Sequence, residues 1–391
     1  MTNFDYSLLR RAAAGVTGLP HALLGIAAVL ALSASAAAQP NVPAPAHLFP
    51  DPDWPVLEES AKTADLRKRL EAYRAWNEEH CGERWAGLVI QNGRMIFEGR
   101  GPRSHIHQRH DCGSIKKSLQ STVLGVALYQ KRLASLDENA LPYWKDAWQP
   151  PYENDRVISF REFASYRDRW NDPAPPGMFR YNNCSAVAAG ACIAGLFMDV
   201  RGARPRGIAE VARREVMEKI GAAWDLWYWE EDFVAGKIGT PGPRLVMESS
   251  VSELAKLGYL WLRRGEWNGR RVFAVEYYKE AVTDWSPDTG SKKSHYVGHY
   301  GFWWFVNRRK ALLPDAPEDA FYHIGNGDPK RATALLIIPS MDIVAVHGMD
   351  RLSDDRQWDV IQNSRGAGNE GMRRWTTEVL KLHAADAANP R

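Results

Sequence analysis

Two side chains that can do chemistry stand three residues apart in the stretch from Asp111 to Leu119, the hydroxyl of Ser114 and the amine of Lys117. The residues from Ser114 onward are largely apolar and contain no proline, which predicts a mostly buried helix that begins near this serine. Residues three apart on a helix share a face, whereas neighbours one or two apart do not. Ser114 can therefore meet Lys117 but not Lys116, which we expect to be solvated.

A serine beside a lysine suits nucleophilic catalysis, provided that several further groups are present. A serine hydroxyl is a poor nucleophile until a base removes its proton. Lys117 serves as that base only when it is neutral, and both burial and the positive end of a helix disfavour its charged form. The leaving group needs a second proton carrier, a role that tyrosine can fill. An oxygen that gains negative charge needs backbone N–H groups as donors.

Two later segments offer these groups. Tyr181-Asn182-Asn183 opens a predicted helix, so a tyrosine hydroxyl and the Asn183 amide would be held rigidly. The segment His323-Ile324-Gly325-Asn326 ends a predicted strand, and its glycine would let a substrate come close to the backbone.

The elements that must position these residues come from both ends of the chain. Asn92-Gly93 predicts a hairpin over 85–98, and a group of strands is expected near the C-terminus, before a final helix over 372–385. These later strands are predicted at 300–307, 321–325, 332–338 and 343–348. The part between is mostly helical. We therefore predict an α/β (α+β) fold in which one antiparallel sheet from both chain ends is flanked by helices, with a helical subdomain inserted.

The three segments resemble a known family. Ser114-x-x-Lys117, Tyr181-x-Asn183 and His323-x-Gly325 follow the chain order of the motifs of the penicillin-recognising serine hydrolases, which include serine β-lactamases and DD-peptidases. The resemblance covers about residues 80 to 380. It is greatest to the β-lactamase-related branch, with class C β-lactamase-like esterases, D-amino-acid amidases and nylon-oligomer hydrolases.

That resemblance implies a β-lactamase/transpeptidase-like fold and a role for each residue. Ser114 would be acylated, while Lys117 and Tyr181 pass the proton. Asn183 would bind the substrate amide, and the backbone N–H groups of Ser114 and Asn326 would form the oxyanion hole. His323 and Gly325 would belong to the same substrate-binding and oxyanion region. The expected substrate is a small-molecule amide or ester, and no cofactor or metal is expected.

One departure from the family pattern concerns the third motif. Dedicated β-lactamases usually carry Lys-Thr-Gly there, and the lysine and threonine help to bind the substrate carboxylate. His323 and Ile324 supply neither a permanent charge nor a hydroxyl. The departure favours a smaller or less acidic ester or amide over penicillins.

Two other functions fit parts of the same sequence. A binding or sensor protein that is acylated without turnover would keep all three motifs. A zinc hydrolase is suggested by His105, His107 and His110, whose spacing is that of a metallo-hydrolase loop. Arg109 stands where that loop normally has an aspartate, and no later ligand set follows.

The composition and the N-terminus bound the remaining possibilities. In 391 residues, a net charge of +3 with no basic run gives no indication of a nucleic-acid partner. Residues 1–38 read as a signal peptide, with Arg10-Arg11, an apolar segment over 22–32 and a small-residue cleavage site. A proline-rich leader over 39–56 and a hydrolase domain over 57–391 follow. We therefore predict a secreted or periplasmic protein without a stable membrane span after processing.

The four cysteines, Cys81, Cys112, Cys184 and Cys192, allow three complete disulfide pairings, and the sequence does not choose among them. Cys184 and Cys192 are predicted about two turns apart on one helix, which is too far to bridge. Buried free thiols are the alternative.

Overall fold

The computed structural model describes several stretches of the chain, all within the unit that spans residues 47–391. They are residues 47–105, 107–144, 157–168, 178–198, 207–229, 244–286, 299–328, 331–349 and 370–383. The predicted signal peptide and residues 39–46 of the predicted leader lie outside the described residues, so they stay predictions.

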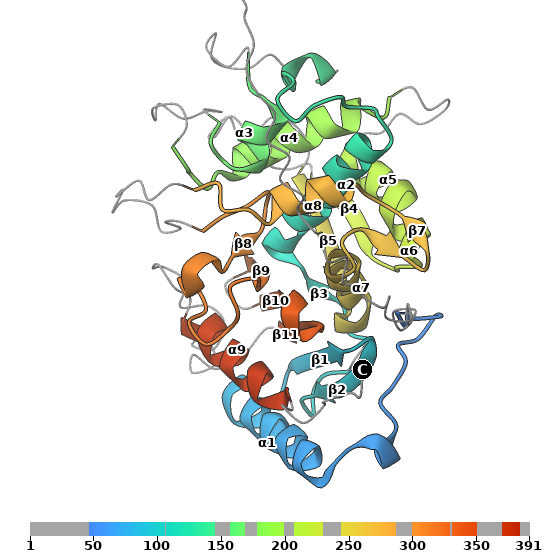
Figure 1. The fold of residues 1–391 in the computed structure, drawn as a ribbon, viewed down its shortest axis with the longest axis vertical. Coiled ribbons are helices and arrows are strands. Elements are labelled where there is room, and N and C mark those ends of the chain that lie inside the picture. Colours follow the sequence, from blue (N-terminus) through green and yellow to red (C-terminus); the bar gives the residue numbers. More distant parts are fainter. Residues whose placement is uncertain are drawn as a thin grey trace, which may run out of the picture. The chain divides into compact units, whose positions relative to one another are not determined.

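Strands gather near both ends of the described chain, and most of the helices lie between them (Figure 1). The helices are α1 Ala64–Cys81, α2 Lys116–Tyr129, α3 Phe160–Ala164, α4 Asn183–Gly195, α5 Ile208–Ala212, α6 Glu218–Ile220, α7 Val251–Leu262, α8 Val275–Ala281 and α9 Glu370–Leu382. The strands are β1 Trp85–Gln91, β2 Arg94–Arg100, β3 His110–Asp111, β4 Asp225–Trp229, β5 Arg244–Ser249, β6 Glu266–Trp267, β7 Arg270–Arg271, β8 Phe305–Val306, β9 Phe321–Asp328, β10 Arg331–Ile338 and β11 Ile343–Met349.

Strands from both ends of the chain form one six-stranded sheet in the order β2-β1-β11-β10-β9-β8, and every neighbouring pair is antiparallel. The two ends meet where β1 pairs with β11, from Trp85 opposite Met349 to Gln91 opposite Ile343. The predicted antiparallel sheet with contributions from both termini is therefore confirmed.

Both faces of this sheet are covered. Side chains alternate along β10, so Leu335 and Ile337 join the large core on the α7 side, whereas Leu336 and Ile338 join the core beneath α1 and α9. Helices α1 and α9 pack together on their side of the sheet, and α7 lies on the other (Figure 1). Burial on both faces explains why β1 and β11 are buried along their whole length.

Local sequence signals set several of these boundaries. Asn92 and Gly93 both have positive φ, of 51° and 73°, which is the conformation that a two-residue hairpin turn needs. The Thr63 hydroxyl accepts a hydrogen bond from the Leu66 N–H at the start of α1, and the Ser250 hydroxyl does the same for Glu253 at the start of α7. The predicted hairpin and the helix that follows Ser250 are thus present.

The middle of the chain contains a second sheet that the sequence did not predict. Strands β3, β5 and β4 form a three-stranded antiparallel sheet between helices. The predicted strand over 300–307 is largely wrong, because the chain doubles back on itself there. Trp303 has a φ of 55°, Tyr300 bridges Phe305, and only Phe305–Val306 joins the main sheet as β8.

The described end of the leader, residues 47–56, lies against the body of the fold. The Tyr259 hydroxyl donates to the Leu48 carbonyl oxygen at 2.6 Å, and the Trp54 indole N–H donates to Ser252 at 3.1 Å. Val56 then forms a parallel bridge with Met95 on the outer strand β2. These contacts cover part of an otherwise open sheet edge.

All four cysteines are buried, and none of them forms a disulfide. Burial raises the pKa of the thiols of Cys81, Cys112 and Cys192, so these groups stay protonated near neutral pH. The alternative of buried free thiols, rather than disulfides, describes this structure.

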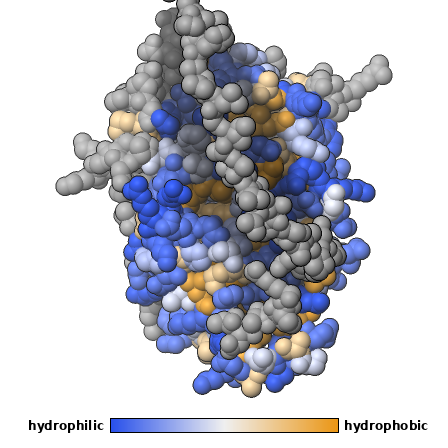
Figure 2. Space-filling model, in the orientation of Figure 1, coloured by the Kyte–Doolittle hydropathy of each residue, from blue (hydrophilic) through white to orange (hydrophobic). Residues whose placement is uncertain are grey.

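The face shown in Figure 2 carries hydrophilic side chains over much of its described surface, with hydrophobic side chains between them. The most exposed large hydrophobic side chains come from separate elements and loops, and include Val56, Val157 and Trp227. Among the described helices, none has the length and apolar character needed to cross a membrane.

Candidate active site

The turn that carries Ser114 is built between β3 and α2. Gly113 has a φ of 47°, a left-handed conformation that favours glycine, and its N–H donates to the Asp111 carboxylate at 2.7 Å. The Cys112 N–H donates to the Met247 carbonyl oxygen of β5 at 2.9 Å. Ser114 therefore lies in a short 3-10 turn, Gly113–Ile115, and α2 begins two residues after it, near the serine as predicted.

Ser114, Lys117 and Tyr181 hydrogen-bond to one another. Lys117 Nζ donates to Ser114 Oγ at 2.8 Å and to the Tyr181 hydroxyl oxygen at 2.7 Å. The Tyr181 hydroxyl donates to Ser114 Oγ at 2.9 Å. Lys117 is 3% exposed, whereas Ser114 and Tyr181 are half-buried. The structure thus brings the three residues predicted to carry proton transfer within direct contact.

Tyr181 is held in place at the start of α4. The next residue, Asn182, caps this helix, and its side-chain oxygen accepts from the Cys184 and Ser185 N–H groups. Asn183, predicted to bind the substrate amide, is the first residue of α4 and is exposed. The adjacent asparagines therefore differ, because one caps the helix and the other lies at the surface.

Tyr166, whose ring packs against Tyr181, has a strained backbone. Helix α3 ends with the Arg167 N–H on the Glu162 carbonyl and the Tyr166 N–H on the Phe163 carbonyl, the pattern in which a left-handed residue follows the helix. Glycine is usual at that position, but here Tyr166 occupies it with a φ of 53°. The left-handed backbone costs a non-glycine residue about 1–2 kcal/mol. The sequence analysis did not single out Tyr166, since only its tertiary contacts set it apart.

Strand β9 passes directly against the turn that carries Ser114. A Cβ atom at Gly325 would lie 2.0 Å from the Cys112 carbonyl oxygen, so only glycine fits there without a shift of the backbone. The reason for this glycine is thus close packing of two backbone segments. Asn326 continues β9, and its side chain lies outside what the structure describes.

His323 lies on β9 and is fully buried. Its Nδ1 is 3.1 Å from the Ile324 carbonyl oxygen, an acceptor only, so the proton of the neutral ring belongs on Nδ1. Its Nε2 is 3.4 Å from the hydroxyl of Tyr300, a buried residue of the site that the sequence analysis also did not single out. Burial, followed by the charge of Lys117, lowers the pKa of His323 to about 3. This residue was predicted to contact substrate, but its ring lies in the interior in this structure.

Two buried histidines predict a loss of stability in mild acid. Burial, followed by His110, also lowers the pKa of His347 to about 3. Unfolded histidines titrate near 6.5, so between about pH 6.5 and 3 the unfolded chain binds more protons than the folded one. The free energy of unfolding should therefore fall as the pH falls, by about 1.4 kcal/mol per pH unit for each histidine.

Urea unfolding between pH 7 and 5 measures this slope in a range where carboxylates contribute little. His347→Gln should reduce the slope of the unfolding free energy against pH by about 1.4 kcal/mol per pH unit, because glutamine does not titrate. An unchanged slope in this variant would show that His347 is not kept neutral by the fold.

Comparison with solved structures decides the fold. The chain is similar to a putative 6-aminohexanoate-dimer hydrolase from Bacillus anthracis, with a TM-score of 0.59 and 16% identity over 88% of this chain and 91% of the other. It is also similar to a putative β-lactamase from Bacteroides dorei, with a TM-score of 0.57 and 13% identity over 82% and 99%. An octameric penicillin-binding protein homologue from Pyrococcus abyssi gives a TM-score of 0.54 and 15% identity over 75% of each chain. The chain has the β-lactamase-like fold.

Comparison of amino-acid sequences gives weaker evidence about this chain than comparison of structures. An uncharacterized protein of Alkalihalophilus pseudofirmus is 29% identical over 134 residues, which are 33% of this chain and 38% of that protein. The match thus spans well under half the length of this curated relative. No family model matches the sequence. The β-lactamase/transpeptidase-like fold that the three short motifs implied is therefore confirmed.

The histidines that suggested a zinc site do not lie together in this β-lactamase-like fold. His105 and His107 are exposed, whereas His110 is buried in β3. Among the residues that the structure describes, no group of three or more His, Cys, Asp or Glu side chains could hold a metal ion. The three histidines are thus not brought together as ligands.

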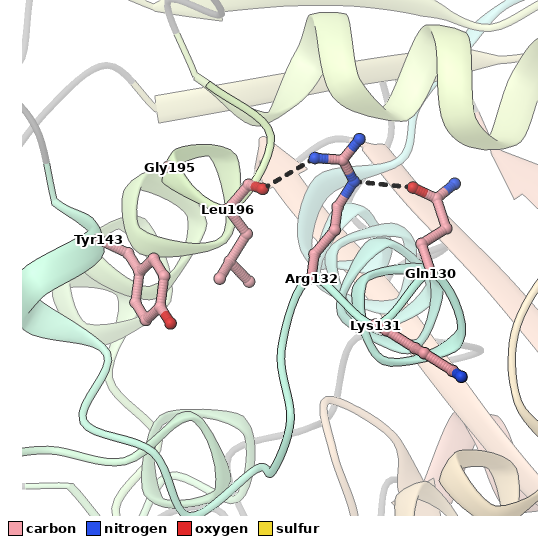
Figure 3. Close-up of a pocket in the computed structure, with 6 residues that line it drawn as sticks. All are labelled: Gln130, Lys131, Arg132, Tyr143, Gly195 and Leu196. Carbon is pink, nitrogen blue, oxygen red and sulfur yellow. Dashed lines mark hydrogen bonds between the residues drawn. The ribbon is translucent and has the colours of Figure 1, made fainter. Parts of the chain in front are cut away.

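A cavity of about 440 Å³ lies where the C-terminal ends of α2 and α4 meet (Figure 3). Arg132 donates there to the Gln130 side chain at 2.9 Å and to the Leu196 carbonyl oxygen at 3.2 Å, which stabilises the end of α4. Ser114 is at the opposite end of α2, so this cavity is separate from the candidate active site.

Proposed function

We propose that this protein is a serine hydrolase that cleaves an amide or ester bond through an acyl-enzyme on Ser114. The observation that carries the proposal is the mutual hydrogen bonding of Ser114, Lys117 and Tyr181, at distances of 2.7–2.9 Å. A nucleophile, a base and a second proton carrier in direct contact are what acyl transfer requires. The hydrolase-type fold neighbours support the same class of reaction.

In the proposed reaction, Ser114 Oγ attacks the carbonyl carbon of the substrate while its proton passes to Lys117. The tetrahedral intermediate collapses, and the leaving amine or alcohol takes a proton through Tyr181. Water then attacks the acyl-enzyme and gives up a proton to the same pair, and the acid is released as Ser114 regains its hydrogen. The first step needs the Lys117 amine in its neutral form.

The backbone N–H groups of Ser114 and Asn326 are proposed to stabilise the oxyanion. Support comes from the close approach of β9 to the Ser114 turn, which leaves no room for a side chain at Gly325. Asn183, exposed next to the Asn182 cap, is proposed to bind the amide or ester group of the substrate.

A screen of the purified protein tests this function. p-Nitrophenyl esters, D-amino-acid amides and a chromogenic cephalosporin should be compared, with mass spectrometry of the protein during turnover. We expect steady hydrolysis of an ester or amide and an adduct on the peptide that contains Ser114. One equivalent of product followed by none would instead indicate an acylated binding protein, and activity abolished by a chelator would indicate a metal enzyme.

Replacing Tyr181 by phenylalanine should slow acylation by about 10²-fold, because the hydroxyl that contacts both Ser114 and Lys117 is lost while the ring remains. Pre-steady-state release of p-nitrophenol measures the acylation rate directly. Tyr143→Phe is the matched control, since that hydroxyl bonds to Glu138, away from Ser114. An acylation rate equal to that of the unmodified protein would show that Tyr181 is structural.

A further inference from the structure

The position of the Tyr181 ring determines whether its hydroxyl reaches Ser114 and Lys117. Its backbone is fixed on both sides, because the Arg180 N–H donates to the Tyr166 carbonyl oxygen at 2.8 Å and Asn182 caps α4. The ring can still turn about its own side-chain bonds. A small displacement of its hydroxyl would break contact with Ser114 Oγ and Lys117 Nζ, so some other group must hold the ring.

Tyr166 makes the ring contact suited to that task. The centroids of the Tyr166 and Tyr181 rings are 4.9 Å apart with an interplanar angle of 45°. The Tyr166 ring also packs against Tyr300, at 5.5 Å, and against Phe179, at 6.4 Å. Tyr166 is itself fully buried, so its ring has little freedom to move away from Tyr181.

The segment that carries Tyr166 is also fastened to α4. Besides the bond from Arg180, the Ser185 hydroxyl donates to the Asp168 carboxylate at 2.6 Å. One short segment thus contacts the residue before Tyr181, the Tyr181 ring and the first turn of α4. Movement of Tyr166 would therefore displace Tyr181, the proposed proton carrier.

Two features of Tyr166 lower the stability of the folded protein. Its backbone is left-handed at a position where glycine is unstrained, and its buried hydroxyl makes no hydrogen bond of regular geometry with the described part of the chain. Glycine or asparagine would relieve the backbone strain at this position but would lose the buried ring. The benefit of a large ring must therefore lie in what the ring contacts.

We propose that Tyr166 is a positioning residue that holds the Tyr181 hydroxyl within reach of Ser114 and Lys117, an inference that rests on the function proposed above. The aromatic ring is the part that acts, because it is the ring and not the hydroxyl that contacts Tyr181. Among the described contacts Tyr166 touches Tyr181 and not the Ser114–Lys117 pair, so it acts on the pair through Tyr181. Its loss should lower kcat and leave KM nearly unchanged.

The test compares three replacements in hydrolysis of a p-nitrophenyl ester. Tyr166→Leu should lower kcat about tenfold or more with KM within about threefold, since misplacement of a catalytic group affects the chemical step. Tyr166→Asn, which suits the left-handed backbone, should fold at least as readily as the leucine variant and lose kcat to a similar extent. Tyr166→Phe should keep kcat within about threefold, because the ring is retained.

Phe273→Leu is the matched control for loss of a buried ring. Phe273 is fully buried and packs on Trp261 and Tyr277, away from Tyr181. It should lower the melting temperature without changing kcat. Tyr166→Leu and Tyr166→Asn are compared with it at equal fractions folded.

The outcomes separate this inference from the proposed function. If the unmodified protein hydrolyses the ester and Ser114→Ala does not, but kcat of Tyr166→Leu and Tyr166→Asn equals that of the unmodified protein, Tyr166 is only structural. A Tyr166→Phe variant as slow as Tyr166→Leu would also overturn the inference, because the hydroxyl would then be the active part. If Ser114→Ala is as active as the unmodified protein, the proposed function itself is wrong.

Discussion

Ser114→Ala is expected to lower kcat/KM for ester hydrolysis by at least about 10⁴-fold, the largest effect of any single change in this protein. Alanine removes the oxygen that both Lys117 and Tyr181 contact, so no acyl-enzyme can form. Hydrolysis of a p-nitrophenyl ester measures the loss, and the mass of the protein during turnover shows whether an adduct forms. The remaining rate should reflect binding and oxyanion stabilisation alone.

Ser121→Ala provides the matched control on the same helix. Ser121 is fully buried, and its hydroxyl bonds to the Tyr277 hydroxyl at 2.8 Å rather than to any residue of the site. Its replacement should lower stability by about 1 kcal/mol and leave the hydrolytic rate unchanged. Activity retained in Ser114→Ala would contradict the assignment of Ser114 as the nucleophile.

Lys117→Ala should lower kcat/KM by about 10²–10⁴-fold, the range expected when a general base is lost. The amine of Lys117 is the group that can take the serine proton, and it lies 2.8 Å from Ser114 Oγ. The rate of formation of the acyl-enzyme on a p-nitrophenyl ester measures this effect. Lys117→Met fills more of the same buried space and should be equally slow, which separates the loss of the base from a loss of packing.

Lys116→Ala is the control for Lys117, since the two neighbours differ in where the helix places them. Lys116 is half-exposed, whereas Lys117 is buried and bonded to both oxygens of the site. Lys116→Ala should keep kcat/KM within about twofold. A large loss in Lys116→Ala and a small one in Lys117→Ala would show that the proton passes through the other lysine.

Local patterns were enough to predict the relation between Ser114 and Lys117. A separation of three residues fixes their distance once the segment is helical, because the backbone alone determines it. The Asn92-Gly93 hairpin was predictable for the same reason, since two residues with positive φ specify the turn. Such features need no information about the rest of the chain.

The errors in strand prediction show the limit of the same approach. Residues 300–307 have the apolar and aromatic composition of a strand, yet left-handed backbone at His299 and Trp303 turns the chain back on itself. The short strands β4 and β5 were not predicted, because each is stabilised by pairing with the other and with β3. Pairing between distant segments determines these elements more than their own residues do.

The sequence by itself determined the fold class, the pairing of Ser114 with Lys117 and the candidates Tyr181 and Gly325, because helical spacing, alternation and turn residues act over short distances. Only the tertiary structure decided that Tyr181, 67 residues from Ser114, completes the hydrogen-bonded set, that Tyr166 packs on its ring and that His323 is buried and neutral. Those facts depend on which distant side chains share a space and on how much water the fold excludes from it. Neither quantity can be read from the order of the residues alone.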